Sequence, residues 1–294
     1  MPELPEVETT TRGLQNRAHK VLCARFLDVW TDSPKLVKKP KSFEEFRKQI
    51  LGKKIKNVWR RAKNIIFDLS DGYSLLVHQK LTGHLLIGKW KFEDAGWKPL
   101  IKGPLEDPTN RFLHLIFWLN NGEMLALSDL RKFAKVELWK TKELLNSKEF
   151  KKLGPEPLDK NFTFEKFKEV LAGKKGKIKQ VLMNQEIIAG IGNIYSDEIL
   201  WEAKIHPFRE TSKLNESELK KIYLATKKIL KKAVKLRGTS ISDFRDPEGK
   251  EGFYNRIRKV YQREGEKCPC CSTKIKRLKI NGRSAHFCPS CQKL

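Results

Sequence analysis

Alternating apolar and polar residues predict short β-strands in the first half of the chain. The clearest apolar runs are residues 64–69, 73–77, 115–119 and 124–127. Asp71-Gly72 separates the first two runs, and Asn121-Gly122 separates the other two. Such dipeptides between apolar runs are strong signals of tight β-hairpins. The pattern therefore indicates an antiparallel sheet or sandwich, preceded by a helix from Pro5 to about Ala18.

Helical patterns replace the alternation in the second half. They cover residues 164–171, 177–183, 194–203 and 217–236. Thr163 and Asn215 stand where helix caps belong. We therefore expect three regions: a strand-rich domain at 1–145, a helical domain at 146–236, and a last region at 237–294 that begins with glycines and charges and ends in a cysteine cluster.

The charge of the chain is strongly basic. Lys and Arg number 61 against 35 Asp and Glu, which gives a net charge of +26. The basic residues are spread along the chain, and a protein this basic is expected to meet a polyanion, most commonly nucleic acid. The alternative is a lysine-rich, solvated surface without such a partner.

The sequence favours a cytoplasmic protein without a membrane segment. No apolar run approaches the roughly 18 residues of a spanning helix. The first six residues, Met1 to Glu6, are acidic and proline-rich, unlike a secretory signal. In the cytoplasm the six cysteines should be reduced, so a cysteine cluster there indicates metal binding before it indicates disulfides.

Two Cys-x2-Cys pairs near the end of the sequence have the spacing of a four-thiolate zinc site. The predicted ligands are Cys268, Cys271, Cys288 and Cys291. We expect one structural Zn²⁺ that holds a short hairpin, with Cys270 and Cys23 outside the ligand set. The turn between the pairs would aim Arg283 outward. A redox or disulfide cluster is the alternative, and a zinc ribbon alone is compatible with DNA, RNA or protein binding.

The beginning of the chain offers a nucleophile. If Met1 is removed, Pro2 becomes a secondary amine, and a chain-terminal amine has a pKa of about 7.7–8.0, so much of it is neutral at physiological pH. Glu3 and Glu6 lie on one face of a helix start and could move protons near that amine. The alternative is ordinary helix-starting chemistry, in which proline and acidic residues are common.

Further short motifs follow in a fixed order. They are Met1-Pro2-Glu3-Leu4-Pro5-Glu6-Val7-Glu8-Thr9, Arg61-Ala62-Lys63, His78-x-x-Leu81-Thr82-Gly83, Asp129-x-Arg131-Lys132-Phe133, Leu153-Gly154-Pro155-Glu156-Pro157-Leu158, Ala189-Gly190-Ile191-Gly192-Asn193-Ile194-Tyr195, Gly238-Thr239-Ser240 with Asp243-Phe244, and Gly282-Arg283 with Phe287-Cys288-Pro289-x-Cys291-Gln292. In this order they resemble the formamidopyrimidine-DNA glycosylase family along almost the whole chain.

The resemblance implies an α+β fold. Its N-terminal catalytic domain would be an antiparallel β-sandwich with a flanking helix. A helix–two-turns–helix DNA-binding domain and a four-cysteine zinc-finger hairpin would follow. The stretch 239–254 would be a mobile loop that covers the lesion, with Gly249 and Gly252 suited to mobility.

The resemblance also implies roles for individual residues. The catalytic set would be Pro2, Glu3, Glu6, Lys63 and Arg283. Pro2 would form a Schiff base with the sugar, Glu3 would protonate the opening sugar ring, and Glu6 would support the site. Lys63 would contact the lesion and its phosphate, although by itself it could be a basic surface residue of a hairpin.

DNA contacts are implied for a second set of residues. It comprises His78, Leu81, Arg131, Phe133, Lys177, Asn193 and Arg283. Asn193 and Arg283 would grip the phosphates beside the damaged nucleotide, and Lys177 would add another phosphate contact. A flipped-out base leaves a gap that an apolar wedge fills. Leu81, Arg131 and Phe133 would fill it, although Leu81 and Phe133 could also be ordinary core residues.

Four positions depart from the family pattern: Leu81 replaces Met, Phe112 replaces His, Leu130 replaces Pro and Ala134 replaces Gly. Leu81 is still apolar and close to Met in volume, so the wedge should survive. Loss of the histidine should remove one phosphate contact. The other two changes affect the fine geometry of the wedge loop.

The predicted function is a bifunctional DNA glycosylase and apurinic/apyrimidinic lyase of base excision repair. Its partner would be double-stranded DNA with 8-oxoguanine, formamidopyrimidines or abasic sites, and the enzyme would act as a monomer. One alternative is the endonuclease VIII-like class, which removes oxidised pyrimidines and tends to carry Gly where this chain has Leu4. The other is a basic zinc-ribbon protein that binds DNA without catalysis.

Overall fold

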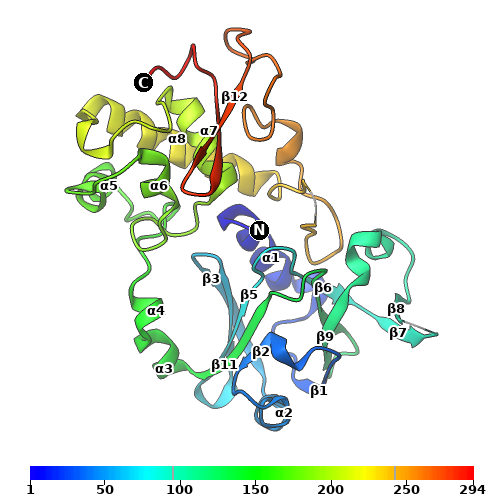
Figure 1. Cartoon of the computed structure of the whole chain (residues 1–294). Coiled ribbons are helices and arrows are strands. Elements are labelled where there is room, and N and C mark those ends of the chain that lie inside the picture. The colour runs from blue at the N-terminus through cyan, green and yellow to red at the C-terminus, as the bar shows by residue number, and fades with distance from the viewer. Residues whose placement is uncertain (95, 242) are drawn as a thin grey trace. The chain divides into compact units, whose positions relative to one another are not determined.

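The computed structural model describes residues 1–94, 96–241 and 243–294, and the chain in it forms two units (Figure 1). Unit 1 comprises Met1–Lys151 and Leu236–Phe253, and unit 2 comprises Lys152–Lys235 and Tyr254–Leu294. The last expected region is thus divided, because residues up to Phe253 pack with the strands and later residues pack with the helices.

Two sheets form the body of unit 1. The first has the order β1 (Phe26–Thr31), β9 (Leu113–Leu119), β10 (Met124–Ser128) and β6 (His84–Gly88). The second has the order β2 (Val37–Lys39), β11 (Lys135–Lys140), β5 (Tyr73–His78), β4 (Asn64–Leu69) and β3 (Ile55–Arg61). Neighbouring strands are antiparallel, except that β2 and β11 are parallel.

The main core of unit 1 lies between these sheets. Alternate residues of each strand point into it, such as Ile65 and Phe67 of β4 and Leu115 and Phe117 of β9, and all four are at most 1% exposed. Each such side chain contributes about 1.5–3 kcal/mol relative to an exposed one. The period of two in the sequence therefore produces a sandwich, and the predicted fold class is confirmed.

Both predicted hairpins are present. β4 and β5 join through Ser70–Gly72, where Asp71 and Gly72 have φ of 60° and 70°. β9 and β10 join at Asn121-Gly122, where Gly122 has φ of 79°. Glycine and aspartate tolerate this left-handed conformation, which explains the strength of the sequence signal.

The outer faces of the two sheets are also covered. A hairpin of β7 (Trp90–Glu93) and β8 (Gly96–Pro99) covers apolar residues of the first sheet, such as Leu86 and Ile116. Leu144 of α3 (Thr141–Asn146) and Phe150 of α4 (Lys148–Lys151) pack against Ile66 and Leu76 of the second sheet. This double coverage explains why these strands are apolar on both faces.

Helix α1 (Leu4–Gln15) is capped by Glu3 and packs Val7 and Leu14 into the core of unit 1. It is shorter than the predicted helix, because Asn16 is extended and its side chain accepts a hydrogen bond from the N–H of Ala18. Helix α2 (Phe43–Ile50) adds to the same core.

The returning segment of unit 1, residues 236–253, is fixed to the sandwich over its second half. Arg245 is buried, and its Nε donates to Asp107 (3.0 Å). The N–H of Ile87 in β6 donates to the carbonyl of Pro247 (2.8 Å). In this structure the second half of the stretch is therefore hydrogen-bonded to the sandwich; that the stretch is a mobile loop stays a prediction.

Gly249 and Gly252 permit close packing in this segment. Gly249 has φ of 82°, and a Cβ there would lie 2.8 Å from the side-chain nitrogen of Asn110. A Cβ on Gly252 would lie 2.4 Å from the carbonyl oxygen of Gly238. These glycines therefore permit tight packing, and their contribution to mobility stays a prediction.

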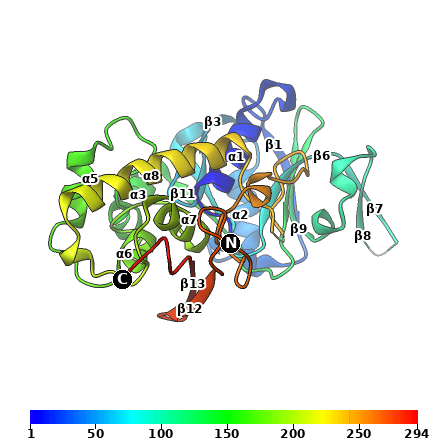
Figure 2. The same ribbon diagram turned by 90° about the horizontal axis from the view of Figure 1, so that it is seen from above.

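Unit 2 contains the predicted helices. They are α5 (Phe164–Leu171), α6 (Ile178–Met183), α7 (Asn193–Ala203) and α8 (Glu216–Lys235). The Thr163 hydroxyl accepts from the N–H of Lys166, and the Asn215 side chain accepts from the N–H of Glu218, so both predicted caps are confirmed. In Figure 2, α7 lies between α8 and the hairpin formed by β12 (Lys276–Ile280) and β13 (Arg283–Phe287).

A buried carboxylate fixes the chain that leads into this hairpin. Glu198 of α7 accepts hydrogen bonds from the N–H groups of Lys259, Val260 and Tyr261 at 2.8–3.0 Å. Burial raises the pKa of Glu198, and these N–H groups oppose the increase.

Among the described residues, the helices lack the combination of length and apolar character that a membrane crossing requires.

Candidate active site, nucleic-acid contacts and metal centre

Two buried glutamates organise the beginning of α1. Glu3 and Glu6 are 2% and 1% exposed. One carboxylate oxygen of Glu6 accepts from the N–H of Glu3 (2.8 Å), and the other accepts from the N–H of Thr239 (2.7 Å). Gly238 has φ of 75°, and a Cβ there would lie 2.8 Å from Glu6. Glycine at 238 therefore permits the returning segment to contact the start of α1.

The amino terminus lies close to these groups. Burial lowers the pKa of the Met1 amino group; the charges of Glu3 and Glu6 oppose that decrease, while Lys63 adds to it and Asp243 opposes it. The Met1 amino group is therefore within electrostatic reach of Glu3, Glu6 and Lys63, three of the residues that the sequence and the family resemblance connected with catalysis. Asp243 joins this group from the returning segment.

Lys63 lies in the two-residue turn between β3 and β4, where Arg61 pairs with Asn64. It is 6% exposed, so the alternative of an ordinary surface lysine is wrong. Beside it, the guanidinium of Arg60 donates to Glu8 of α1 (2.8 Å) and to the carbonyl of Ala62 (2.9 Å).

The contact between Arg60 and Glu8 joins the turn that carries Lys63 to α1. Burial acts to raise the pKa of Glu8, but the hydrogen bonds and charges of Arg60 and Arg12 outweigh it, so the pKa is lowered and Glu8 stays ionised. Sequence reasoning missed this pair. The two residues are 52 positions apart, and no local pattern connects them.

The candidate wedge residues lie on loops of unit 1. Phe133 is 54% exposed, and the Arg131 guanidinium lies 5.5 Å from the centre of its ring. Leu81 is half-buried. Phe133 is therefore not a core residue, which excludes one of the two interpretations of this position.

Asp129 shapes the loop that carries Arg131 and Phe133. Its fully buried carboxylate accepts from the N–H groups of Arg131 (3.3 Å) and Ala134 (2.7 Å) and from the hydroxyl of Thr82. Ala134 is 1% exposed and fits the place of the family glycine. The sequence pattern placed Asp129 in the motif without a role, and the structure identifies it as the residue that holds the loop.

Two histidines near these loops are neutral or paired. The His78 ring accepts from the N–H of Lys80 (3.0 Å), and burial, reinforced by the charges of Lys80, Lys63 and Lys135, lowers the pKa of His78 to about 3. His114 forms a hydrogen bond with Asp32 (2.9 Å).

In unit 2, Asn193 at the start of α7 lies beside the zinc-finger hairpin. Its side-chain nitrogen contacts the Ser284 hydroxyl (3.3 Å), and Arg283 next to it is exposed at the start of β13. A cavity of about 180 Å³ is lined by Gln180, Met183, Asn184, Ile280, Asn281 and Arg283. The structure thus places Asn193 against Ser284, the residue that follows Arg283 in β13. Lys177, at the cap of α6, pairs instead with Glu210 (2.5 Å).

A buried polar cluster holds this arrangement, and sequence reasoning missed it. Asp197 of α7 accepts from the Lys179 ammonium (2.5 Å) and from both the N–H (2.9 Å) and the ring Nδ1 (2.9 Å) of His286 in β13. Lys179 and Asp197 are at most 1% exposed. One carboxylate therefore connects α6, α7 and the hairpin.

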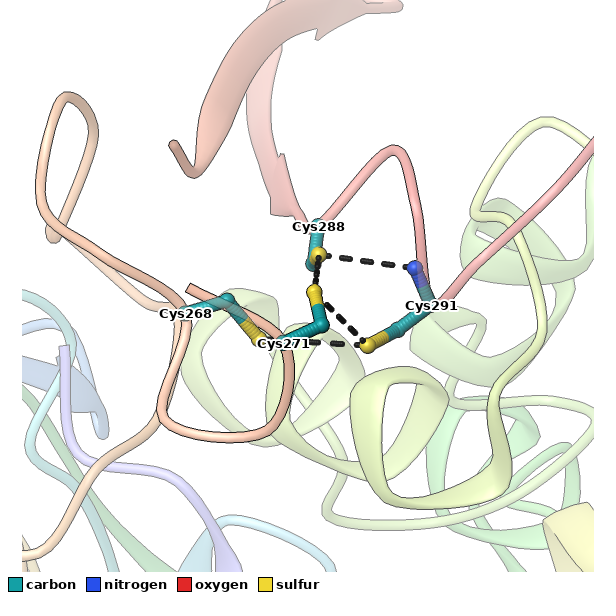
Figure 3. Close-up of side chains that lie close together, drawn as sticks. All are labelled: Cys268, Cys271, Cys288 and Cys291. Carbon is teal, nitrogen blue, oxygen red and sulfur yellow. Dashed lines mark hydrogen bonds between the residues drawn. The ribbon is translucent and has the colours of Figure 1, made fainter. Parts of the chain in front are cut away.

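The four predicted zinc ligands lie together (Figure 3). The sulfur atoms of Cys268, Cys271, Cys288 and Cys291 all lie within 4.8 Å of one another. Tetrahedral Zn²⁺ with Zn–S bonds of about 2.3 Å requires S–S distances of about 3.8 Å. Recorded S–S contacts of 3.4 and 3.9 Å fit this geometry.

Hydrogen bonds around the sulfurs also suit thiolates. The indole N–H of Trp201 and the N–H of Cys270 donate to the sulfur of Cys268, each at 3.5 Å. The thiols of Cys270 and Cys23 are outside the cluster, as the sequence analysis expected. The bound metal would join the two loops of a hairpin too small to bury a core of its own, so its contribution is structural.

A sandwich with a buried Pro2 before its first helix and a helical unit with a four-cysteine hairpin indicate the class of zinc-finger DNA glycosylases. Family models agree. The formamidopyrimidine-DNA glycosylase N-terminal domain matches residues 1–136, the H2TH domain of the same glycosylases matches 153–245, and the zinc finger found in FPG and IleRS matches 265–294.

Curated relatives and solved structures agree as well. The formamidopyrimidine-DNA glycosylases of Pelotomaculum thermopropionicum and Streptococcus mutans are 40% and 37% identical, with 100% of both chains covered in each case. A complex of a Lactococcus lactis Fpg variant with Fapy-dG DNA superposes with a TM-score of 0.85 at 35% identity, covering 100% of both chains. A complex of that species' Fpg with abasic-site DNA gives a TM-score of 0.84 at 35% identity, covering 99% of this chain and 100% of that one. The chain belongs to the formamidopyrimidine-DNA glycosylase family.

Proposed function

We propose that this protein excises oxidised purines, 8-oxoguanine and formamidopyrimidines, from duplex DNA and cleaves the strand at the abasic site. The solved relatives from Lactococcus lactis were captured with Fapy-dG DNA and with abasic-site DNA, which supports this substrate class. The protein would act as a monomer on DNA in the cytoplasm.

The observation that carries the proposal is the surroundings of the amino terminus. A desolvated amine near two buried carboxylates and a buried lysine is suited to nucleophilic and acid–base chemistry. Burial favours the neutral amine, which is the form that attacks. Removal of Met1 would transfer this position to the imino group of Pro2.

The proposed reaction begins with attack of the Pro2 nitrogen on C1′ of the damaged nucleotide. The N–C1′ bond forms as the glycosidic bond breaks, and the base leaves with a proton. Glu3 then protonates the ring oxygen, which opens the sugar and leaves an iminium ion at C1′. A base then removes a proton from C2′, and the iminium accepts the C–H electron pair; the enamine so formed expels the 3′ phosphate as the C3′–O bond breaks (β-elimination). Loss of the C4′ proton expels the 5′ phosphate in the same way as the C5′–O bond breaks (δ-elimination), so phosphate ends remain on both sides of the gap.

Other residues would position the DNA. Lys63 would contact the lesion and its phosphate, and Glu6 would hold the start of α1 and the segment at Thr239. Arg283 and Asn193 would bind flanking phosphates; Arg283 would thereby assist catalysis. Further DNA contacts are proposed for His78 and Lys177. The ion pair of Lys177 with Glu210 would have to open for a phosphate contact.

The proposed wedge consists of Leu81, Arg131 and Phe133. Exposure of the Phe133 ring and the neighbouring Arg131 guanidinium supports an insertion role. Arg131 would read the cytosine opposite the lesion through its hydrogen-bond donors. The loop geometry set by Asp129 would present these groups together.

Borohydride trapping tests the proposal directly. Incubation with 8-oxoguanine duplex and borohydride should reduce the iminium to a stable amine and leave DNA attached to residue 2. Intact-mass analysis of the free protein should show a chain that begins at Pro2. The Pro2→Gly variant should cut at least about 100-fold more slowly, whereas Lys142→Gln, an exposed position in α3, should react as the wild type.

A Pro2→Gly variant that cuts at the wild-type rate, or an active preparation that retains Met1, would contradict the mechanism. The same assay should compare 8-oxoguanine with an oxidised pyrimidine, because a Lactococcus lactis relative was solved with DNA containing an oxidised pyrimidine. Faster release of the pyrimidine would favour that substrate class. DNA binding without cleavage of either substrate would indicate a protein that has lost catalysis.

A further inference from the structure

The outer face of α8 carries a dense group of lysines. These lysines are Lys220, Lys221, Lys227, Lys228, Lys231, Lys232 and Lys235, and we call them the α8 lysine face. At about 100° per residue they occupy less than half of the helix circumference. All are exposed except Lys227, which is half-buried. The opposite face of α8 is buried and includes Ile222, Ile229 and Leu230.

Few acidic groups neutralise this face. Lys228 pairs with Glu202 (2.6 Å), and the Lys227 ammonium donates to the carbonyl of Asp159 (2.9 Å). For the other five lysines, no ion pair is recorded within the described ranges of the chain. Glu216 and Glu218, at the beginning of α8, pair elsewhere, with Lys168 and Arg209.

Several of these lysines repel one another. Lys227 and Lys231, Lys228 and Lys232, and Lys231 and Lys235 are four residues apart, a spacing at which like charges destabilise a helix. Burial, followed by the charge of Lys231, lowers the pKa of Lys227. A polyanion laid along the helix would relieve this repulsion and release its own counterions.

We propose that the α8 lysine face binds a second segment of duplex DNA, independently of a lesion. The 15 residues between Lys220 and Lys235 span about 22 Å, which matches about seven base-pair steps of a DNA strand. Lysines are point charges that suit sequence-independent phosphate contacts. Because the apolar face of α8 is buried in unit 2 and Leu224 is the only exposed large apolar residue of this helix, α8 has no apolar face to insert into a membrane.

This surface is distinct from the proposed lesion contacts of the same unit. α7 separates α8 from the hairpin that carries Arg283, as Figure 2 shows. A duplex on the α8 lysine face would therefore leave Arg283 and Asn193 available. Binding of two duplexes at once would let the protein pass from one DNA segment to another without free diffusion.

The test replaces five exposed lysines by glutamine, a good helix former. The variant carries Lys220→Gln, Lys221→Gln, Lys231→Gln, Lys232→Gln and Lys235→Gln. A control carries the same loss of charge on unit 1: Lys35→Gln, Lys38→Gln, Lys41→Gln, Lys48→Gln and Lys142→Gln, all exposed positions. Thermal unfolding should show that both are folded.

Titration with undamaged duplex should give one fewer bound duplex for the α8 variant than for the wild type and the control. The slope of log K against log salt at that second site should fall by about 0.9 for each lysine that contacts a phosphate. Dissociation from an abasic-analogue duplex should accelerate with added undamaged duplex for the wild type and the control, but not for the α8 variant.

Single-turnover cleavage of lesion DNA should be the same in all three proteins. This readout separates the two proposals. A wild type that does not cleave lesion DNA would contradict the glycosylase mechanism, whereas the number of bound duplexes would still test the α8 proposal. Equal duplex counts in the wild type and the α8 variant would overturn the α8 proposal. So would an equal loss in the control, or a loss of binding to phosphatidylserine vesicles without a loss of duplex binding.

Discussion

Individual buried polar side chains hold segments of unit 1 in place through hydrogen bonds. The Glu6 carboxylate bonds to the N–H groups of Glu3 and Thr239, which is 233 positions away. Asp129 holds the loop of Arg131 and Phe133 in the same manner. Buried carboxylates of this kind are costly to desolvate, so their hydrogen bonds determine whether the local fold is stable.

His78 should make the fold sensitive to acid. Its pKa is about 3 in the folded state and about 6.5 in an unfolded chain, so between these values only the unfolded chain binds the proton. Stability is therefore lost as the pH falls below about 6.5. Between pH 7 and pH 5 we expect His78 to account for roughly 1–2 kcal/mol of lost unfolding free energy.

Urea unfolding at both pH values checks this expectation with His78→Asn, which keeps an acceptor for the N–H of Lys80 but does not titrate. The wild type should lose roughly 1–2 kcal/mol more than the variant on acidification. His84, whose pKa burial also lowers, is present in both proteins and cancels in the comparison. Equal losses would show that His78 is protonated in the folded state.

Asp129→Ala should destabilise unit 1 by about 2–4 kcal/mol, because the N–H groups of Arg131 and Ala134 and the hydroxyl of Thr82 lose their acceptor. Asp129→Asn should be milder, since one acceptor oxygen remains. Chemical denaturation measures both variants, and KM for lesion duplex should rise with the loss of loop order. An alanine variant as stable as the wild type would contradict the role given to Asp129.

Sequence motifs predicted which of these residues come together, but not all of their partners. The proline-rich start singled out Glu3 and Glu6, and the resemblance of Arg61-Ala62-Lys63 to the family motif singled out Lys63. Asp129 was found only as part of a motif, and the contact between Arg60 and Glu8 was not found. Contacts between residues distant in sequence depend on strand register and helix packing, which local patterns do not specify.

At the scale of elements, the zinc-finger hairpin depends on its metal and on α7. Four thiolates hold the loops, and Asp197 binds His286 of β13. Cysteine spacing predicted the metal site in full, because two Cys-x2-Cys turns suffice to define a tetrahedral set. The link from Asp197 to His286 and Lys179 could not be predicted, since each of these residues alone is a common helix or strand residue.

Removal of zinc by a chelator should unfold the hairpin while the sandwich of unit 1 stays folded. Limited proteolysis followed by mass analysis should show new cuts within residues 262–294, and binding of lesion DNA should fall at least about 10-fold, because Arg283 loses its support. Cys271→Ser should behave as the chelated protein. Cys270→Ser is the matched control and should keep one zinc; unchanged proteolysis after chelation would contradict a structural role for the metal.

At the scale of the whole chain, the predicted order of strand-rich, helical and cysteine-containing regions is confirmed. Residues 237–253, however, were assigned to the cysteine-containing region by their position in the sequence, whereas they belong to unit 1. These residues follow α8 directly and begin with glycine and charge, so they resemble the start of a new region. Their hydrogen bonds to β6 and Asp107 instead belong to unit 1. Only the folded arrangement reveals such a return of the chain.

This return limits how the protein can be taken apart. A gene fragment that ends at Lys151 would encode every strand of the sandwich, yet it would lack the peptide that covers Ile87, packs against Gly13 and satisfies Glu6. Neither unit can be produced by a single truncation or exchanged by simple end-to-end fusion. Recombination during evolution would meet the same obstacle, so the two units are expected to be inherited together.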